Sequence, residues 1–312
     1  MARHPTRHLT VIGDIHGEAD LLDRLLARID DDFGSDDDGL DDDSHDDDSR
    51  GDELVFIGDL VDRGHDNRGV VETVRALVRA GRATCLMGNH ELNAVLFHTR
   101  GPDGAPLREH SAKTFAQHAA FLRDYPVGAP ETADVIGWFA RLPLFHETHG
   151  LRLVHAEWHA GTIDYLRGIC DREGRLPPDW TDRWPRDAAL RAAVERVTKG
   201  TRFPLPEGRT YTDKTGFIRD TARLAWWDAA GASDLAAQIA GPSDRKALGD
   251  GVPPLDTDAA YPADAPTVVF GHYGLDDDTP YRAPNVVCTD FTRRAGGPLT
   301  AWRTDGRWVQ VR

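Results

Sequence analysis

Three apolar segments near the start of the chain each end in a glycine followed by a polar residue, and this pattern constrains the fold most. The segments His8–Ile12, Leu54–Ile57 and Ala83–Met87 have the length and apolar character of buried strands. Between them, Ala19–Ile29 and Val70–Ala80 carry apolar residues at helical spacing. A strand–helix–strand–helix–strand order predicts parallel strands joined by right-handed crossovers.

The rest of the chain contains further candidate strands and two long insertions. The strands are expected at Leu151–Val154, Thr267–Phe270, Asn285–Cys288, Leu299–Arg303 and Arg307–Val311. The last two flank Thr304-Asp305-Gly306, a turn signal that predicts a hairpin. Residues 92–148 and 160–262 are mixed in character, and we expect insertions on a single domain spanning 1–312. We expect residues 160–262 to be mainly helical and to set substrate specificity.

The negative charge of the chain is concentrated in one tract. The 312 residues include 52 acidic and 37 basic side chains, which gives a formal net charge of −15. Residues 30–53 hold fourteen of the acids and one arginine, so the rest of the chain is nearly neutral. The tract has no apolar face to bury, and we expect a flexible surface insert. A near-neutral body without a basic stripe argues against a long nucleic acid as partner.

Nothing in the sequence indicates export or a membrane. The N-terminal residues lack the apolar stretch of a signal peptide, and no run of apolar residues is long enough to span a bilayer. Cys85, Cys170 and Cys288 are far apart and form no CxxC motif. This usage indicates neither a disulfide framework nor a thiolate zinc site, and we expect a cytoplasmic protein.

Polar side chains follow five of the predicted strands at their carboxyl ends. They are Asp14, His16, Asp59, Asn89, His155 and His272. Ligands of α/β proteins bind at the carboxyl ends of the strands, so these side chains are expected to converge. Carboxylate, imidazole and amide groups together suit Mn²⁺, Fe or Zn²⁺. Six candidates fit two divalent ions better than one, and two ions about 3.5–4 Å apart suit phosphoryl transfer.

Each of these motifs has an ordinary explanation when taken alone. A Gly-Asp pair is usually only a turn, and a lone histidine in an apolar strand, such as His155 or His272, is more often a core residue. Three glycine-bearing motifs in order, each ending a predicted strand, favour a functional site over these separate explanations.

The motifs resemble the calcineurin-like metallophosphoesterase superfamily. They are GDIHG at Gly13–Gly17, GDLVDRG at Gly58–Gly64 and GNHE at Gly88–Glu91, followed by His155-Ala156 and Gly271-His272. The Asp-Arg-Gly and the Glu are similar to those of the branch that contains serine/threonine phosphoprotein phosphatases and symmetrical diadenosine tetraphosphate hydrolases. The resemblance implies an α/β fold, a four-layer α/β/β/α metallophosphoesterase sandwich, here with helical insertions and with both metals at the sheet edge.

The same resemblance implies how the ligands are shared between the two metals. It assigns Asp14, His16 and Asp59 to the first metal. It assigns Asp59, Asn89, His155 and His272 to the second, so that Asp59 serves both. Mn²⁺ is the favoured ion, with Fe or Zn²⁺ as alternatives.

Other residues acquire catalytic or substrate-binding roles from the resemblance. His90 would protonate the leaving oxygen, and Asp62 would orient it. Arg63 would bind phosphate oxygens, because its planar guanidinium matches them. Arg219 and Arg223 are candidates for a second phosphate-binding arginine.

The sequence departs from the family pattern after the fourth-strand histidine. Phosphoprotein phosphatases usually have Gly-Gly there and diadenosine hydrolases Ala-Gly, whereas this chain has Ala156-Glu157. Glu157 would either alter the charge near the site or face solvent. The other histidines show no ligand spacing and are interpreted as surface or core residues; among them are His98, His110 and His118.

We predict a dinuclear metal-dependent phosphoesterase, similar to serine/threonine phosphatases, in which water activated by the metals attacks phosphorus. The favoured reaction is hydrolysis of a phosphomonoester, in a phosphoprotein or a small phosphorylated molecule. One alternative is a nucleotide anhydride hydrolase of the diadenosine tetraphosphatase type. Another is a non-catalytic binding protein on the same scaffold, which the complete set of ligand and catalytic residues disfavours.

Overall fold

The computed structural model describes residues 8–33, 53–205, 208–212, 218–228, 234–240, 254, 260–275, 279–291 and 296–312. Most of the acidic tract therefore lies outside the described residues. Within the described ranges the chain forms two five-stranded sheets and two small two-stranded ones.

The first sheet contains the three strands that the start of the sequence predicts. Its order is β14-β13-β1-β2-β3. The strands β1, β2 and β3 are parallel, and β13 runs antiparallel to both β1 and β14. The predictions of parallel strands and of a C-terminal hairpin are confirmed. The bounds are Leu9–Ile12 (β1), Glu53–Phe56 (β2), Ala83–Cys85 (β3), Leu299–Arg303 (β13) and Trp308–Val311 (β14).

The second sheet has the order β11-β12-β10-β5-β4. Its three central strands, β5, β10 and β12, are parallel, and antiparallel strands form both edges. These two edge strands were not predicted from the sequence, because they are short and carry polar residues. The bounds are Phe145–Thr148 (β4), Leu151–Val154 (β5), Thr267–Phe270 (β10), Tyr281–Ala283 (β11) and Val286–Cys288 (β12).

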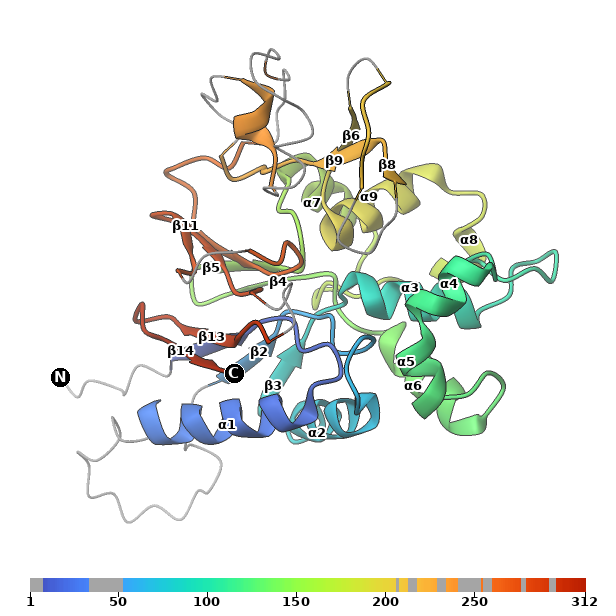
Figure 1. Ribbon diagram of the computed structural model, residues 1–312, viewed down its shortest axis with the longest axis horizontal. Coiled ribbons are helices and arrows are strands. Elements are labelled where there is room, and N and C mark those ends of the chain that lie inside the picture. Colours follow the sequence, from blue (N-terminus) through green and yellow to red (C-terminus); the bar gives the residue numbers. More distant parts are fainter. Residues whose placement is uncertain are drawn as a thin grey trace.

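The two sheets pack face to face and form a sandwich (Figure 1). Alternate residues of a strand point to opposite faces, so one set from each sheet meets in a shared apolar core. That core contains Leu9, Val11, Val55, Ile57, Leu86, Leu151, Leu153, Val269, Val287 and Trp302. Each such side chain contributes about 1.5–3 kcal/mol when fully buried. The core fixes the two sheets against each other and aligns their edges.

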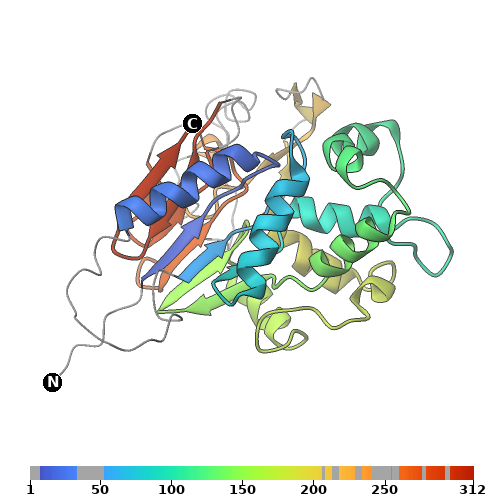
Figure 2. The ribbon, with the colours of Figure 1, turned by 90° about the horizontal axis from the view of Figure 1, so that it is seen from below.

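Helices cover the outer face of the first sheet. Figure 2 shows α1 (Ala19–Phe33) and α2 (Asn67–Arg79) lying across it. Their apolar sides, with Leu22 and Leu25 in α1 and Val70 in α2, are buried. The Asp66 side chain caps α2 by accepting a hydrogen bond from the Gly69 amide at 2.8 Å.

Aromatic residues cover part of the outer face of the second sheet. The Trp226 ring lies 5.0 Å from Phe270 of β10 and 5.8 Å from Tyr261, measured between ring centroids. Its indole N–H donates to the Ala156 carbonyl at 2.9 Å. Trp226 is fully buried, and its position here is that of a packing residue.

The insertions differ in structure. Between β3 and β4 the chain is helical, with α3 (Asn89–His98), α4 (Ala112–Gln117), α5 (Ala119–Asp124) and α6 (Pro130–Phe139). After β5, helices extend to Lys199 as α7 (Ala160–Arg167), α8 (Trp180–Arg183) and α9 (Ala188–Lys199). Beyond them lie β6 (Arg202–Pro204), β7 (Tyr211–Thr212), β8 (Ile218–Arg219), β9 (Thr221–Arg223) and the 3-10 turn η3 (Leu235–Gln238).

None of the helices in the described part of the chain has the length and apolar character needed to cross a bilayer. Cys85, Cys170 and Cys288 are all free thiols. The expectation that these three cysteines form no disulfide is confirmed.

Candidate metal centre

All six predicted ligands lie at or just beyond the carboxyl ends of parallel strands. Asp14 and His16 follow β1, Asp59 follows β2, and Asn89 is the first residue of α3, after β3. From the second sheet, His155 follows β5 and His272 follows β10. Because the two sheets are packed with these ends together, residues far apart in the sequence meet in one place.

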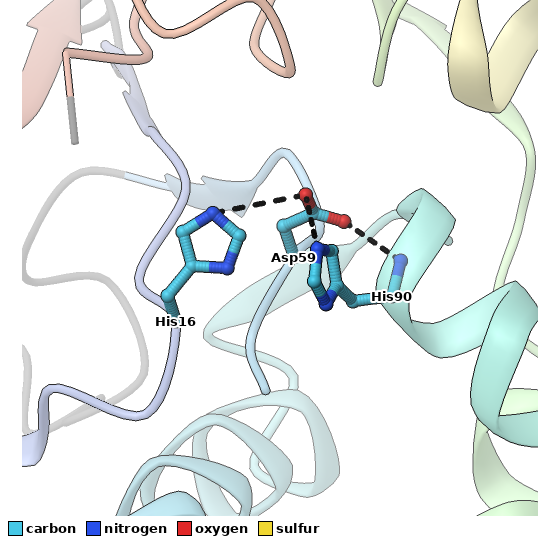
Figure 3. Close-up of side chains that lie close together, drawn as sticks. All are labelled: His16, Asp59 and His90. Atoms are coloured by element: carbon cyan, nitrogen blue, oxygen red, sulfur yellow. Dashed lines mark hydrogen bonds and ion pairs between the residues drawn. The ribbon is translucent and has the colours of Figure 1, made fainter. Parts of the chain in front are cut away.

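Asp59 lies at the middle of this group. One carboxylate oxygen, Oδ2, is 3.9 Å from His16 Nε2 and 3.8 Å from His90 Nε2 (Figure 3). The other, Oδ1, is 3.3 Å from His155 Nε2 and accepts a hydrogen bond from the His90 amide at 2.9 Å. One buried carboxylate thus faces imidazoles from both sheets, which is the geometry expected of a ligand shared by two ions.

Two groups of side chains could each hold an ion, and Asp59 belongs to both. His16, Asp59 and His90 form one group, and Asp59, His155 and His272 form the other; within each, the ligand atoms lie within 4.8 Å of one another. Asn89 adds an amide oxygen 3.4 Å from His155 Nε2.

Asp14 joins the same cluster from β1. Its Oδ2 lies 3.8 Å from His16 Nε2, and its carboxylate accepts hydrogen bonds from the His272 amide at 3.2 Å. All six predicted ligands are therefore brought together. The first group also includes His90, to which the resemblance assigns a different role.

The backbone adopts unusual conformations at these residues. Among the described non-glycine residues, positive φ angles occur at six positions, and five of them belong to the predicted site: His16, Asp59, Asp62, Arg63 and His272. Such conformations are costly and are retained where surrounding structure enforces them. They turn the side chains out of the strand ends and toward one another.

Two of the motif glycines are required by close approach. A Cβ at Gly88 would collide with the amide and carboxylate of Asp59, and one at Gly271 would collide with the Asp14 carboxylate. Glycine at these positions lets neighbouring strand ends come close enough for their ligands to share a site.

Glu91 organises the turn that carries Asp59. Its buried carboxylate accepts hydrogen bonds from the backbone amides of Asp59 and Leu60, both at 2.8 Å, and of Gly88 at 2.9 Å. Burial, reinforced by the nearby Asp59 carboxylate, raises the pKa of Glu91 to about 7. The last residue of the GNHE motif is thus a structural acceptor that ties α3 to the end of β2.

The electrostatics of the cluster suit divalent cations. Burial, together with Asp290 and Asp59, raises the pKa of Asp14, as expected where buried carboxylates crowd one another. Burial also lowers the pKa of His16 and of His272, with Arg63 and Arg223 respectively adding to the effect. Neutral imidazole is the form that binds a metal.

His272 supplies a direct test of fit. Its Nδ1 is buried and has no hydrogen-bond partner among the described residues. A buried polar nitrogen without a partner is costly, and a bound metal ion would satisfy it. His155 is oriented instead by its Nδ1, which lies 2.9 Å from the Ile57 carbonyl and leaves Nε2 toward Asp59. The donor set therefore fits two divalent ions.

His90 and Asp62 form the predicted pair. His90 Nδ1 donates to Asp62 Oδ2 at 2.7 Å, while Nε2 faces Asp59. Burial alone would lower the pKa of His90, but Asp59 and the hydrogen bond to Asp62 outweigh it and raise the pKa above its usual value. The pair is built as a general acid would require.

A residue that the sequence analysis dismissed also contacts this pair. His118, interpreted as a surface or core residue, donates from Nδ1 to the other oxygen of Asp62 at 2.9 Å. His118 lies between α4 and α5, in an insertion with no motif, and its distance from Asp62 in the chain conceals the contact. No spacing signal in the sequence points to it.

The three candidate phosphate-binding arginines are placed differently. Arg63 is exposed and lies near both His16 and His90. Burial lowers the pKa of His16 most, and the positive charge of Arg63 lowers it further. Arg223, on β9, donates to the His272 carbonyl at 3.3 Å. Arg219, on β8, pairs in register with Tyr211 in a separate two-stranded sheet.

Glu157 does not face solvent. It is fully buried and forms an ion pair with Arg196 of α9, with Arg196 Nε donating to Oε1 at 2.7 Å. The Thr201 amide donates to its other oxygen at 2.6 Å. Glu157 therefore anchors the end of α9 to the segment after β5.

Comparison with known proteins agrees with this architecture. The family model described as calcineurin-like phosphoesterase matches residues 7–292. The chain belongs to the calcineurin-like phosphoesterase family.

The chain is also similar to several named proteins. A symmetrical bis(5'-nucleosyl)-tetraphosphatase of Ralstonia nicotianae is 29% identical over 200 residues, which is 57% of this chain and 65% of that protein, a little under two thirds. One of Janthinobacterium sp. is 27% identical over 286 residues, 83% of this chain and 85% of that protein. Among solved structures, a serine/threonine phosphatase of Saccharomyces cerevisiae matches 98% of this chain and 79% of its own, with 12% identity and a TM-score of 0.46.

Proposed function

We propose that this protein is a dinuclear metal-dependent phosphoesterase that cleaves the phosphoric anhydride of a dinucleoside tetraphosphate. The observation that carries the phosphoesterase part is Asp59, which belongs to both groups of candidate metal ligands. From the sequence alone, the favoured substrate was a phosphomonoester. The names of the relatives favour the alternative, since both are symmetrical bis(5'-nucleosyl)-tetraphosphatases and one matches over most of both chains.

The proposed ligands are Asp14, His16 and Asp59 for one ion and Asp59, Asn89, His155 and His272 for the other. When bound, two divalent cations would acidify water and neutralise the charge that develops on the phosphoryl group. The protein's own contribution is to hold these donors in a fixed arrangement, through the Glu91 hydrogen bonds and the packing between the sheets.

The proposed general acid is His90. Its Nδ1 is held by Asp62, so its Nε2 is directed toward the candidate metal ligands, 3.8 Å from Asp59 Oδ2. A proton on Nε2 would pass to the leaving oxygen as the bond between phosphorus and oxygen breaks. Loss of a positioned general acid typically costs 10²–10⁴-fold in rate, and most for poor leaving groups.

Arg63 and Arg223 are the proposed phosphate-binding pair. Both flank ligand residues, Arg63 beside His16 and Arg223 beside His272. Arg219 serves as the matched control, because it lies only four residues before Arg223 but belongs to a different two-stranded sheet, where it pairs with Tyr211. Arg223→Ala should lower kcat/KM by about 10- to 100-fold, as expected for a charged hydrogen bond, and Arg219→Ala by less than about threefold. Equal losses in the two variants would mean that Arg223 does not bind the phosphate.

The substrate is tested by direct competition at equal concentration in Mn²⁺, with Asp59→Asn as blank. Diadenosine tetraphosphate, para-nitrophenyl phosphate and a phosphoserine peptide are compared by chromatography and phosphate release. We expect diadenosine tetraphosphate to turn over fastest and to give ADP as its nucleotide product, because symmetrical cleavage leaves two phosphates on each adenosine. Faster phosphate release from either monoester would reinstate the phosphomonoester reaction. Binding of metal without turnover of any substrate would favour a non-catalytic role.

A further inference from the structure

Two histidines donate to one buried carboxylate beside the candidate metal centre. His90 Nδ1 lies 2.7 Å from Asp62 Oδ2, and His118 Nδ1 lies 2.9 Å from Asp62 Oδ1. The Asp62 side chain is 3% exposed and that of His118 is fully buried. A carboxylate in such a position needs hydrogen bonds on both oxygens, since an unmet acceptor in a dry interior is costly.

The ring of His118 is fixed by its surroundings. It stacks on Phe121 of α5, with ring centroids 4.7 Å apart and an angle of 17° between the planes. A second aromatic ring, Phe97 of α3, lies 5.1 Å away. The backbone amide of His118, which directly follows α4, donates to the Thr114 carbonyl within that helix. The imidazole therefore cannot turn away from Asp62 without disturbing the packing of two helices.

The far side of His118 meets a third histidine. His118 Nε2 and His98 Nε2 are 3.3 Å apart. Burial, with His118 and His110 nearby, lowers the pKa of His98 to about 4, so His98 is neutral near pH 7. A neutral His98 can donate from Nε2 to the unprotonated Nε2 of His118. That arrangement leaves the proton of His118 on Nδ1, where Asp62 needs it.

The backbone at Asp62 makes the second donor important. Asp62 has a φ of 70°, a conformation that a non-glycine residue holds only under constraint. Its amide donates to Asn67 Oδ1 at 2.6 Å, which fixes the main chain. Among the described residues, only the imidazoles of His90 and His118 donate hydrogen bonds to its side chain. Without His118, the carboxylate could rotate and present either oxygen to His90.

We propose that His118 is a positioning residue for catalysis: it holds Asp62 so that His90 keeps a proton on Nδ1 and presents Nε2 to the leaving oxygen. In the reaction, the Nε2–H bond of His90 breaks as the leaving oxygen gains that proton and separates from phosphorus. His90 is left neutral with Nδ1–H still bonded to Asp62, and solvent returns the proton. This inference rests on the proposed function of His90 as general acid.

A purely structural His118 would behave differently. Its loss would lower stability, or impair the whole site in equal measure for every substrate. A positioning role predicts a loss confined to kcat, larger for substrates with a poor leaving group, and absent when His90 is already gone.

The test uses the metal-loaded, full-length protein and three variants. His118→Phe keeps an aromatic ring for the stack on Phe121 but removes both nitrogens. His118→Asn places a side-chain N–H close to the position of Nδ1 and serves as the conservative rescue. His110→Phe is the matched control, since His110 also packs on Phe97, at 3.9 Å between centroids, and its Nε2 bonds to the Phe97 carbonyl instead of Asp62. Thermal unfolding of each variant checks the fold.

We expect His118→Phe to lower kcat on a poor leaving group by about 10- to 100-fold, part of the full general-acid contribution, with KM unchanged. His118→Asn should recover most of this loss, and His110→Phe should stay within about twofold of the parent. In a His90→Ala background, His118→Phe should cost nothing further. Losses that multiply in the double variant, or that fall equally on good and poor leaving groups, would overturn the proposal.

A second measurement separates this proposal from the proposed function. Nitrogen-15 NMR of histidine-labelled protein, loaded with diamagnetic Zn²⁺, reports which ring nitrogen carries a proton. We expect Nδ1 of His118 and of His90 to be protonated in the parent, and the His90 signal to shift in His118→Phe. If no substrate turned over while this NMR pattern was observed, the proposed hydrolase activity would be refuted. The orientation of His90 by His118 through Asp62 would still stand. An unprotonated His118 Nδ1 in the parent would overturn the positioning, whatever the turnover.

Discussion

The first sheet and the second sheet supply ligands to the same candidate centre but hold them in different ways. On the first sheet, the turn that carries Asp59 is tied by three backbone hydrogen bonds to Glu91. On the second sheet, His155 is oriented by a carbonyl of the first sheet, that of Ile57. Nδ1 of His272 has no partner within the described ranges.

This difference separates two sources of preorganisation. The first-sheet ligands are positioned within their own sheet, by motif glycines and by Glu91, the hydrogen-bond acceptor that the GNHE motif presents to the turn after β2. The second-sheet imidazoles are positioned by the packing of the two sheets, and we propose that a bound ion would supply the partner that His272 Nδ1 lacks among the described residues. Mutations on the two sides should therefore affect stability and metal binding in different proportions.

The largest effect is expected at Asp59, the residue common to both sides. Asp59→Asn should abolish turnover, by at least about 10³-fold, because it removes a buried negative charge that both candidate ions would share. The fold should survive, since asparagine tolerates the left-handed backbone that Asp59 adopts, with a φ of 53°. Activity in Mn²⁺ and circular dichroism test this. Activity within tenfold of the parent would mean that Asp59 is not a shared ligand.

The second-largest effect is expected at Glu91, which holds the turn that carries Asp59. Glu91→Ala should lower the free energy of unfolding by about 3 kcal/mol or more, because three buried amides lose an acceptor. Urea unfolding of the metal-free protein measures this loss. Glu91→Gln, which keeps one carbonyl acceptor, should lose less. A loss below about 1 kcal/mol for Glu91→Ala would contradict the role of Glu91 in holding the turn.

A ligand mutation on the second sheet should cost little stability but much metal affinity. His272→Ala removes no side-chain hydrogen bond among the described residues, so the metal-free protein should lose only about 1–2 kcal/mol, from the ring contacts with His155 and Tyr273. Metal affinity should fall by at least about 10- to 100-fold. Titration with Mn²⁺ and urea unfolding, run side by side, make the comparison with Glu91→Ala. Unchanged metal affinity in His272→Ala would mean that His272 is not a metal ligand.

The smallest effect expected is a pH dependence of the free energy of unfolding that arises from His98, at the end of α3. The pKa of His98 is lowered to about 4 from an ordinary value of 6.5, chiefly by burial. As pH falls below 6.5, the unfolded chain takes up this proton before the folded one, so stability decreases down to about pH 4. His98→Gln should lose less stability between pH 7 and pH 5 than the parent does. Parallel urea midpoints for the two proteins would contradict the lowered pKa.

The fold and the candidate ligands were predictable to different depths. Gly58-Asp59 and Gly88-Asn89 are visible because a strand, a glycine and a ligand follow one another in sequence. His155 and His272 have only short motifs, and their convergence depends on how the two sheets pack. The edge strands β4 and β11 were missed because their short polar sequences lack a strong strand pattern.

His118 and Glu157 show where sequence reasoning stops. The contact of His118 with Asp62 depends on the path of a helical insertion, which no local spacing encodes. Glu157 departs from the family pattern in sequence, yet its partner Arg196 lies on a distant helix. A buried ion pair of this kind becomes apparent only when tertiary contacts are known.

The central claim is that residues from two sheets hold two metal ions through one shared carboxylate. The most direct measurement is the metal content per chain after Mn²⁺ loading and removal of free metal, for the parent and Asp59→Asn. We predict about two ions per chain in the parent and fewer than one in Asp59→Asn, because the shared ligand serves both positions. One ion or none in the parent, or two retained in Asp59→Asn, would contradict the dinuclear centre.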